Sequence, residues 1–424
     1  MLELNLIKKN SADIIKKLAK RGDDYSQRIN SILQLNQKRI KNQQELDTIL
    51  EESNKIGQLI GQLARSNKLK EVNELKEQAT QIKLKAKDLN ELSKKISKNI
   101  EEKLISIPNI PHQSVPDGKD AIENKEIYRW GKSINNPKIK PHWELAEQYD
   151  IIDFQNGAHI TGSGFPIYKG KGARLQRGLI NFFLDYNTSK GYTEYIPPYF
   201  VNEQSAFNTG QIPDKEGMMY HIKDDNLFAI PTAEVPITNI FRNDRFNKSE
   251  LPIKCTAYSP CFRREAGSYG KEVRGLNRLH QFDKVEIVQI CRPSNSYIVL
   301  EEMVSHVSEL LKKLGLEFRI VKLCGGDLGF TSALTYDFEV YSPAQKKWLE
   351  VSSVSNFETF QSNRLKIKYI KTEPKNSELC HTLNGSSLAL PRVMAALLEQ
   401  NQTQEGINIP KGISKYVDFN KITI

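Results

Sequence analysis

The chain has 424 residues and a formal net charge of +10, from 61 Lys and Arg against 51 Asp and Glu. This length allows two or three domains, and the basic balance favours a polyanionic partner. No apolar run approaches the length of a membrane span, and the N-terminal residues lack the apolar core of a signal peptide. We therefore expect neither a membrane partner nor export.

Cysteine usage indicates a reducing environment. The cysteines are odd in number and show no CxxC spacing, so neither a disulfide framework nor a structural zinc site is expected. Free Cys usually packs as a small hydrophobic residue. We predict buried free thiols and a cytoplasmic location. The residues concerned are Cys255, Cys261, Cys291, Cys324 and Cys380.

The N-terminal quarter has the pattern of paired helices. Residues 1–24 predict a short helix that ends at Gly22. Apolar residues then recur at steps of three and four over residues 32–63, and again over residues 72–100. Residues 66–68 provide a reversal between the two series. We therefore predict an antiparallel coiled-coil hairpin roughly 50 Å long.

This hairpin is basic. Residues 25–104 contain 16 Lys and Arg against 11 Asp and Glu. A solvated charged face is one interpretation, and a lever that lies along a nucleic-acid backbone is the other. Six lysines crowd the second helix, namely Lys83, Lys85, Lys87, Lys94, Lys95 and Lys98.

A proline-rich stretch divides the chain. Residues 106–120 can hardly form a helix or a central strand, so they predict a linker between a domain over residues 1–105 and a second over residues 121–424. The WGKS sequence at residues 130–133 resembles the end of a phosphate loop. No Gly stands five residues before Gly131, so we reject that motif.

Beyond residue 140, predicted strands and helices mix without a strict βαβ alternation, which favours an α+β fold with an antiparallel sheet flanked by helices. Helices are predicted for residues 172–191 and 388–400, the second opening at Pro391. Strands are predicted for residues 192–200 (broken by Pro197–Pro198), 227–241, 335–342 and 346–357, and for both sides of a hairpin over residues 261–286.

The hairpin over residues 261–286 is the most informative stretch. Two predicted strands flank a loop at residues 266–275, and arginines occur on both sides of it. Guanidinium groups at this spacing suit a phosphate chain, because each can hold two oxygens at once. A salt-bridged surface hairpin is the alternative. The arginines are Arg263, Arg264, Arg274 and Arg278.

Further motifs decide between these interpretations, because together they resemble a known family. GYTEYIPP (191–198), FRRE (262–265) with RLHQFDKVE (278–286), and NGSSLALPR (384–392) resemble the three signature motifs of class II aminoacyl-tRNA synthetases. PNIPH (108–112), TAE (232–234), EVSSVSNF (350–357) and HTLNGS (381–386) are similar to the seryl-tRNA synthetase family within that class. With the basic hairpin, the resemblance covers essentially the whole chain.

The resemblance implies an ATP-dependent serine–tRNA ligase. It would attach L-serine to tRNA(Ser) through a seryl-adenylate, bind tRNA with the N-terminal hairpin, and form a homodimer through the first motif. It leaves open whether selenocysteine tRNA is also charged. No zinc is expected, because TAE resembles the zinc-free form and no zinc-ligand spacing occurs.

The same resemblance implies an ATP site with Mg²⁺. Arg263 would hold the α-phosphate, and Arg278 and Arg392 the phosphate tail. Phe282 would stack on adenine, with Arg392 on the other ring face, and Glu265 would accept from the adenine amino group. Glu350 and Ser353 would bind the magnesium ion. The predicted catalytic residues are Arg263, Arg392 and Glu350. The full predicted ATP set is Arg263, Arg264, Glu265, Arg278, Phe282, Glu350, Val351, Ser352, Ser353 and Arg392.

A second set of residues would bind the amino acid. Carboxylates and hydroxyls suit the ammonium and hydroxyl of serine, and such a site can reject alanine by roughly 10⁴-fold. Threonine would be excluded because no space is left for its methyl group. The predicted serine-binding residues are Thr232, Ala233, Glu234, Arg263, Glu286, Asn384 and Ser386.

Two departures from the family pattern and two competing functions bear on this interpretation. Arg264 stands where a small residue is common, and Gly164 replaces what is usually Arg. A non-catalytic RNA-binding protein on the same body would have lost the phosphate-binding arginines or Glu350, which are present. A related enzyme that loads carrier proteins would lack the long basic hairpin.

Overall fold

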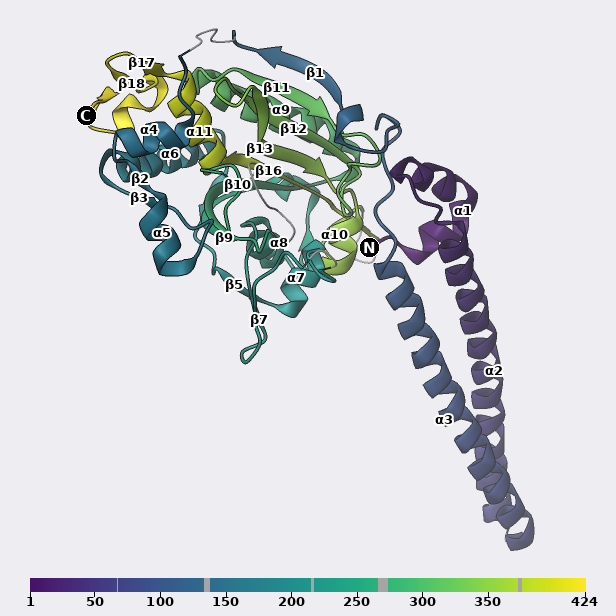
Figure 1. Cartoon of the computed structure of the whole chain (residues 1–424). Coiled ribbons are helices and arrows are strands. Elements are labelled where there is room, and N and C mark those ends of the chain that lie inside the picture. Colours follow the sequence, from purple (N-terminus) through teal and green to yellow (C-terminus); the bar gives the residue numbers. More distant parts are fainter. Residues whose placement is uncertain (67, 133–137, 215–216, 266–273, 373–375) are drawn as a thin grey trace. The chain divides into compact units, whose positions relative to one another are not determined.

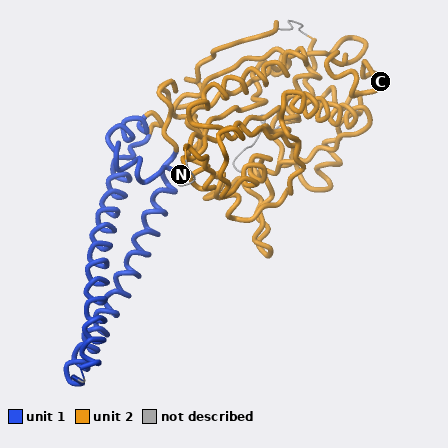
Figure 2. Tube along the Cα trace, turned by 180° about the vertical axis from the view of Figure 1, so that it is seen from behind, with its two compact units in different colours: residues 1–19, 23–108 blue, residues 20–22, 109–424 orange. Residues whose placement is uncertain are grey.

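The computed structural model describes residues 1–424 except 67, 133–137, 215–216, 266–273 and 373–375. The chain divides into two compact units. Unit 1 contains residues 1–19 and 23–108, and unit 2 contains residues 20–22 and 109–424 (Figure 2). Among the helices described, none is both long and apolar enough to cross a membrane.

Unit 1 is helical. Helix α1 spans Leu4–Leu18, and α2 (Ser26–Arg65) and α3 (Leu69–Ile105) run side by side in opposite directions (Figure 1). The antiparallel hairpin predicted from the apolar spacing is therefore confirmed. At about 1.5 Å per residue, the 40 residues of α2 make it somewhat longer than predicted. The reversal predicted at residues 66–68 includes Asn67, which lies outside the described residues.

The seam between α2 and α3 follows the predicted spacing of three and four residues with one exchange, at Arg39, which falls on that spacing counted from Ile32. Arg39 points to solvent, and the neighbouring Asn36 is buried in its place. Asn42 is also buried, and its amide donates to the carbonyl of Leu89 at 2.8 Å and to the hydroxyl of Ser93 at 2.7 Å. A satisfied polar group in an apolar seam favours one register over its neighbours.

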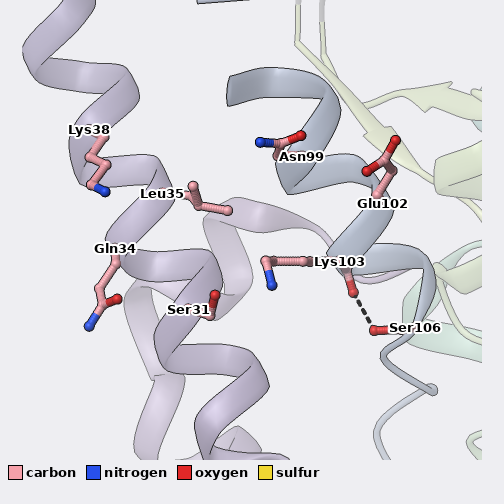
Figure 3. Close-up of a pocket in the computed structure, with 8 residues that line it drawn as sticks. All are labelled: Ser31, Gln34, Leu35, Lys38, Asn99, Glu102, Lys103 and Ser106. Atoms are coloured by element: carbon pink, nitrogen blue, oxygen red, sulfur yellow. Dashed lines mark hydrogen bonds between the residues drawn. The ribbon is translucent and has the colours of Figure 1, made fainter. Parts of the chain in front are cut away.

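A groove of about 420 Å³ lies between α2 and α3 within unit 1 (Figure 3). It is lined mostly by polar side chains, and the hydroxyl of Ser106 donates to the carbonyl of Lys103 at 2.8 Å at its edge. None of the residues predicted for ATP or serine belongs to it. Its lining residues are Ser31, Gln34, Leu35, Lys38, Asn99, Glu102, Lys103 and Ser106.

Unit 2 is built on an eight-stranded sheet in the order β1-β11-β12-β13-β16-β10-β9-β4. Each neighbouring pair is antiparallel except β4 with β9, so the predicted antiparallel core is confirmed. The strands are β1 (Lys125–Trp130), β4 (Thr193–Tyr195), β9 (Ile253–Phe262), β10 (Gln281–Cys291), β11 (Phe318–Lys322), β12 (Leu334–Ser342), β13 (Lys347–Asn356) and β16 (His381–Ala389).

Three helices cover one face of this sheet with their apolar sides: α6 (Gly170–Ser189), α9 (Ser296–Leu314) and α11 (Leu390–Gln400). The shorter helices are α4 (His142–Gln148), α5 (Phe154–Thr161), α7 (Glu203–Thr209), α8 (Glu234–Ile240) and α10 (Phe360–Leu365). The remaining strands are β2 (Ile152–Asp153), β3 (Ile167–Tyr168), β5 (Phe200–Asn202), β6 (His221–Ile222), β7 (Leu227–Ala229), β8 (Arg245–Phe246), β14 (Lys368–Ile370), β15 (Ser377–Leu379), β17 (Gln402–Thr403), β18 (Gly406–Asn408) and β19 (Lys421–Ile422).

One strand prediction is wrong. Residues 227–241 were expected to be extended because they are rich in β-branched residues. Only β7 is a strand there, and α8 follows from Glu234. Pro236 lies in the first turn of α8, where a missing N–H costs nothing, and the hydroxyl of Thr232 accepts from the Glu234 amide at 3.3 Å. Burial of Val235 and Ile237 then outweighs their weak helix propensity.

Two other predictions from the sequence hold. Residues 106–120 contain neither helix nor strand. All five cysteines are free and buried, as predicted.

Candidate active site

The predicted site residues converge on the face of strand β10 that the three long helices leave uncovered. Val285 and Ile287 pack into the helix-covered core, whereas Lys284 and Glu286 alternate with them and project from the other face. Phe282 has the same alternation as Lys284 and Glu286, and its half-buried ring also borders the core. The alternation of side chains along β10 therefore places an aromatic ring, an ammonium group and a carboxylate in one row.

Glu286 is the centre of a buried polar cluster. Its Oε2 accepts from Nζ of Lys284 at 2.6 Å and from the hydroxyl of Thr232 at 3.0 Å, and the residue is 1 % exposed. Its Oε1 has no hydrogen-bond partner among the described residues. A buried carboxylate oxygen left without a donor favours a ligand that brings one, such as an ammonium or hydroxyl group.

Glu234 lies beside this cluster on the first turn of α8. Its Oε1 accepts from the side-chain amide of Gln361 at 2.6 Å. Burial, and then the negative charge of Glu286, raise the pKa of Glu234 to about 7. A ligand cation bound nearby would lower the pKa of Glu234 again, because a positive charge favours the ionised carboxylate.

Arg263 joins the carboxylate cluster to the aromatic ring. Its guanidinium carbon lies 5.2 Å from the ring centroid of Phe282, and its Nε donates to the carbonyl of Pro231 at 3.4 Å. Pro231 directly precedes Thr232. The guanidinium of Arg263 thus lies over the face of Phe282.

Arg392, at the start of α11, contacts Glu350 of β13. Its Nη1 donates to the Glu350 carbonyl at 2.8 Å and lies 3.7 Å from the carboxylate. Its Nε donates to the carbonyl of Asn277 at 2.9 Å. The guanidinium is thus held between the segment before β10 and the strand that carries the predicted metal ligands.

The two sides of the arginine-rich hairpin also meet. Nη1 of Arg278 lies 3.1 Å from Oε2 of Glu265, which adopts a left-handed backbone conformation with a φ of 48°. A positive φ in a non-Gly residue is uncommon and frequent at functional sites. Most of the loop predicted between these residues, at 266–273, lies outside the described residues.

Asp337 of β12 was not predicted from the sequence. Strand pairing sets it opposite Ser353, which is a predicted metal ligand. Burial and the nearby Glu350 carboxylate raise its pKa well above the ordinary value, although a hydrogen bond with Ser353 opposes this shift. Its Oδ1 has no hydrogen-bond partner within the described part of the chain. These hard oxygens form a donor set that suits Mg²⁺.

The remaining predicted residues differ in what their side chains do. Ser386 and Asn384 of β16 pair with Glu286 and Val288 of β10, which places them beside the carboxylate cluster. The hydroxyl of Ser352 donates to the carbonyl of Ser386 at 2.6 Å.

Three of the predicted residues contribute less directly to this face. Val351 packs in the helix-covered core and Ala233 in a second apolar cluster, so only their backbones can face a ligand. Arg264 is exposed, and its amide donates to the carbonyl of Met218 at 2.8 Å.

The departure at Gly164 has a local reason. Its φ is 85°, and a Cβ there would lie 2.5 Å from Cδ2 of His280. His280 in turn accepts or donates a 2.8 Å hydrogen bond with the Tyr220 hydroxyl and stacks on Phe165. Any side chain at residue 164 in this conformation would displace the histidine that precedes β10.

Two buried residues of the cluster, Lys284 and Gln361, were also missed. Lys284 stands two residues from both Phe282 and Glu286, so the period of a strand could have indicated it. Gln361 lies on α10, and nothing in its local sequence points to Glu234, more than a hundred residues earlier.

Known proteins match this chain along its whole length. Residues 1–111 match the "Seryl-tRNA synthetase N-terminal domain", and residues 220–401 match the "tRNA synthetase class II core domain (G, H, P, S and T)". The serine–tRNA ligase of Salinibacter ruber is 44% identical over 424 residues, which are 100% of this chain and 99% of that relative. The chain belongs to the seryl-tRNA synthetase family.

Solved structures of the seryl-tRNA synthetase family have the same fold. The seryl-tRNA synthetase from Pyrococcus horikoshii complexed with ATP superimposes with a TM-score of 0.95 at 33% identity, over 100% of this chain and 99% of that one. The cytoplasmic serine–tRNA ligase from Naegleria fowleri in complex with AMP gives a TM-score of 0.89 at 25% identity, with the same coverage. The family and fold class predicted from the motifs are thus confirmed.

Proposed function

We propose that this chain attaches L-serine to tRNA(Ser) at the expense of ATP, through a seryl-adenylate. The observation that carries the proposal is the buried cluster of Glu286, Thr232 and Glu234, which has an unsatisfied carboxylate oxygen and lies beside Arg263. The ammonium and hydroxyl of serine supply the donors that this cluster lacks. Family membership supports the same activity.

Adenylation needs positioning and charge neutralisation rather than an enzyme nucleophile. A carboxylate oxygen of serine attacks the α-phosphorus of ATP, the bond to the bridging oxygen breaks, and pyrophosphate leaves. Arg263 binds the α-phosphate, where charge redistributes, and also the serine carboxylate. Arg278 and Arg392 bind the phosphate tail, and Phe282 stacks on adenine.

For these contacts to form, two ion pairs must exchange partners. Arg392 leaves the Glu350 carboxylate, and Arg278 leaves Glu265. Glu265 is then able to accept from the adenine amino group. Both pairs are at least partly exposed, so their loss costs little compared with a charge-assisted contact to phosphate.

Glu350, Ser353 and Asp337 would hold a magnesium ion through their oxygen atoms. When bound, it would neutralise charge on the ATP phosphates. The unpartnered Asp337 oxygen and its raised pKa support this position, because a divalent cation would favour the ionised carboxylate. Asp337 thus extends the ligand pair predicted from the sequence.

Seryl transfer requires tRNA, and we assign its binding to unit 1. The terminal ribose hydroxyl attacks the carbonyl carbon of the adenylate, and AMP leaves. Residues 1–105 would form the tRNA-binding domain, residues 106–120 the linker and residues 121–424 the catalytic domain. Lys83, Lys87, Lys94 and Lys95 of α3 are exposed, and none pairs with a carboxylate among the described residues. Such lysines suit the backbone of a structured RNA stem.

We further propose a homodimer that forms through the first class II motif. Ile196 is 86 % exposed, and Phe200 on β5 is also exposed. Large apolar side chains left this exposed favour a protein partner. Sedimentation of the intact chain at micromolar concentration should give the mass of two copies.

The activity is tested by charging. Purified protein, ATP, Mg²⁺ and labelled serine should form acid-precipitable seryl-tRNA with a tRNA(Ser) transcript. No product should form with a tRNA(Ala) transcript, which serves as the matched control. Failure to charge tRNA(Ser) while seryl-adenylate accumulates would overturn the assignment of the RNA partner and leave the adenylation chemistry in place.

Serine binding should strengthen as pH rises through 7. The Glu234 carboxyl is mostly protonated at pH 6 and mostly ionised at pH 8, because its pKa lies near 7. The ammonium of serine binds the ionised form, so we expect about tenfold tighter binding at pH 8 than at pH 6. Titration calorimetry at both pH values measures this ratio.

Glu234→Gln should bind serine more weakly and lose most of this pH dependence. Glu250→Gln, which changes an exposed carboxylate, should leave the ratio as it is. An unchanged tenfold ratio in Glu234→Gln would assign the titrating group to another residue.

A further inference from the structure

A buried histidine outside the predicted site contacts the segment that holds Arg392. His142 is the first residue of α4 and is completely buried. Its Nε2 lies 2.9 Å from the amide nitrogen of Leu276, which can only donate. Nε2 therefore carries no proton, and the ring proton is on Nδ1.

Glu399 of α11 fixes this tautomer. Its Oε1 accepts from Nδ1 of His142 at 2.8 Å and from the His142 amide at 3.1 Å. Its Oε2 accepts from the hydroxyl of Ser342 and from the amide of Ala344 at 3.3 Å. The carboxylate is fully buried and has four donors, so it holds the imidazole in one orientation.

The contact with Leu276 depends on the residue before it. Gly275 has a φ of 68°, and a Cβ there would lie 2.3 Å from Nε2 of His142. Only glycine allows the backbone to approach the ring this closely. On the same helix, the ring of Trp143 packs 4.8 Å below the guanidinium of Arg274. Helix α4 thus contacts residues 274–276 through the side chains of His142 and Trp143.

The segment continues directly to the ATP site. The carbonyl of Asn277, one residue after Leu276, accepts from Nε of Arg392 at 2.9 Å. The Asn277 side chain exchanges hydrogen bonds with Gln345, at 2.8 and 3.3 Å. A continuous set of buried or half-buried contacts therefore runs from Glu399 through His142 to the guanidinium of Arg392.

We propose that His142 is a positioning residue of the ATP site. By accepting the Leu276 amide, it fixes the Asn277 carbonyl and hence the guanidinium of Arg392. The inference rests on the proposed function, because it takes the ATP phosphates as the ligand of Arg392. His142 is proposed to act through Leu276 and Asn277 and not by contact with a substrate. It does not belong to any of the motifs that carry the family resemblance.

Two substitutions test the roles of the two imidazole nitrogens one at a time. In His142→Gln, a side-chain carbonyl can occupy the place of Nε2 and keep the acceptor for Leu276. In His142→Asn, the amide can occupy the place of Nδ1 and donate to Glu399, but the Leu276 amide loses its acceptor. A buried amide left without an acceptor shifts its segment or admits water.

The test is serine-dependent ATP–pyrophosphate exchange with the full-length chain. His142→Asn should raise the KM for ATP about tenfold and leave the KM for serine unchanged, whereas His142→Gln should stay within about twofold of the parent. Leu145→Ala is the matched control, since it removes a buried side chain of the same helix. It should lower the melting temperature without changing the KM for ATP. The proposal would be overturned if His142→Asn and His142→Gln changed the KM for ATP equally, or if His142→Asn left it unchanged.

Two further readouts do not depend on catalysis. Titration calorimetry with ATP alone should give the same order of variants in their affinity for ATP. If the chain showed no serine-dependent exchange, the proposed function would be refuted, and the calorimetry would still test this inference. Nitrogen-15 NMR of His142 in the unmodified protein should show an unprotonated Nε2 and a protonated Nδ1. The opposite tautomer would overturn the proposal even if neither variant folds.

Discussion

Removing residues 30–100 is expected to abolish serylation of tRNA and to leave serine-dependent ATP–pyrophosphate exchange largely intact. The deletion removes most of α2 and α3, with the lysines proposed to contact the RNA backbone. The residues proposed for ATP and serine all belong to unit 2, which is compact by itself. Loss of many phosphate contacts should lower kcat/KM for tRNA by at least about 10³-fold.

A charge variant provides a control that keeps the hairpin folded. Lys83, Lys87, Lys94 and Lys95 are exposed, so their replacement by Ala removes charge without touching the seam. The variant should have a higher KM for tRNA and a shallower salt dependence, with exchange unchanged. Loss of exchange and serylation together in the deletion would contradict the division of labour between the two units.

Arg263→Ala is expected to lower the rate of serine-dependent exchange by about 10³-fold, through kcat more than through the KM for ATP. A donor aimed at charge that develops in the transition state contributes about 4 kcal/mol when its site excludes water. Arg263 is half-buried between Phe282 and the backbone before Thr232, and bound ATP and serine would cover it further.

Two further variants of arginine sharpen this result. Arg263→Lys keeps the charge and loses the planar fork, so its rate should fall between those of the parent and of Arg263→Ala. Arg242→Ala makes the same chemical change at an exposed position of unit 2 and should leave exchange unchanged. A tenfold rise in the KM for ATP with an unaltered kcat would assign Arg263 to ground-state binding alone.

The helical hairpin shows what periodicity can predict. Spacing of three and four residues placed Ile32, Leu46 and Ile96 in the seam, and all three are buried there. The exchange of Arg39 for Asn36 was not predictable, because polar residues at both positions leave the pattern ambiguous. Burial of Asn36 depends on the facing helix and not on its own neighbours in sequence.

The sheet and the site show where such prediction ends. Strand period brings Phe282 and Glu286 to one face, so part of the site follows from the sequence directly. The grouping of Thr232, Glu234 and Glu286 was inferred only through resemblance to a family, because it depends on α8 packing against β10. The residues of α8 were mispredicted as part of a strand, since β-branched composition outweighed the two prolines, Pro231 and Pro236, in the local pattern.

Asp337 and Gln361 were missed for a related reason. Each is placed by a contact between elements, Asp337 by pairing of β12 with β13 and Gln361 by the hydrogen bond from α10 to Glu234. No local motif encodes strand register or the docking of a short helix. His142 is similar, because its role follows from a hydrogen bond to a residue 134 positions later.

The central claim is that the buried polar cluster around Glu286 selects serine for activation. ATP–pyrophosphate exchange with Mg²⁺ and each of the twenty amino acids, in the absence of tRNA, tests it most directly. We predict exchange with serine. Alanine should be slower by roughly 10⁴-fold because it leaves the polar groups of the cluster unpaired, and threonine should be excluded. Exchange with a different amino acid would contradict the assignment of Thr232, Glu234 and Glu286, and no exchange with any would contradict the enzymatic function itself.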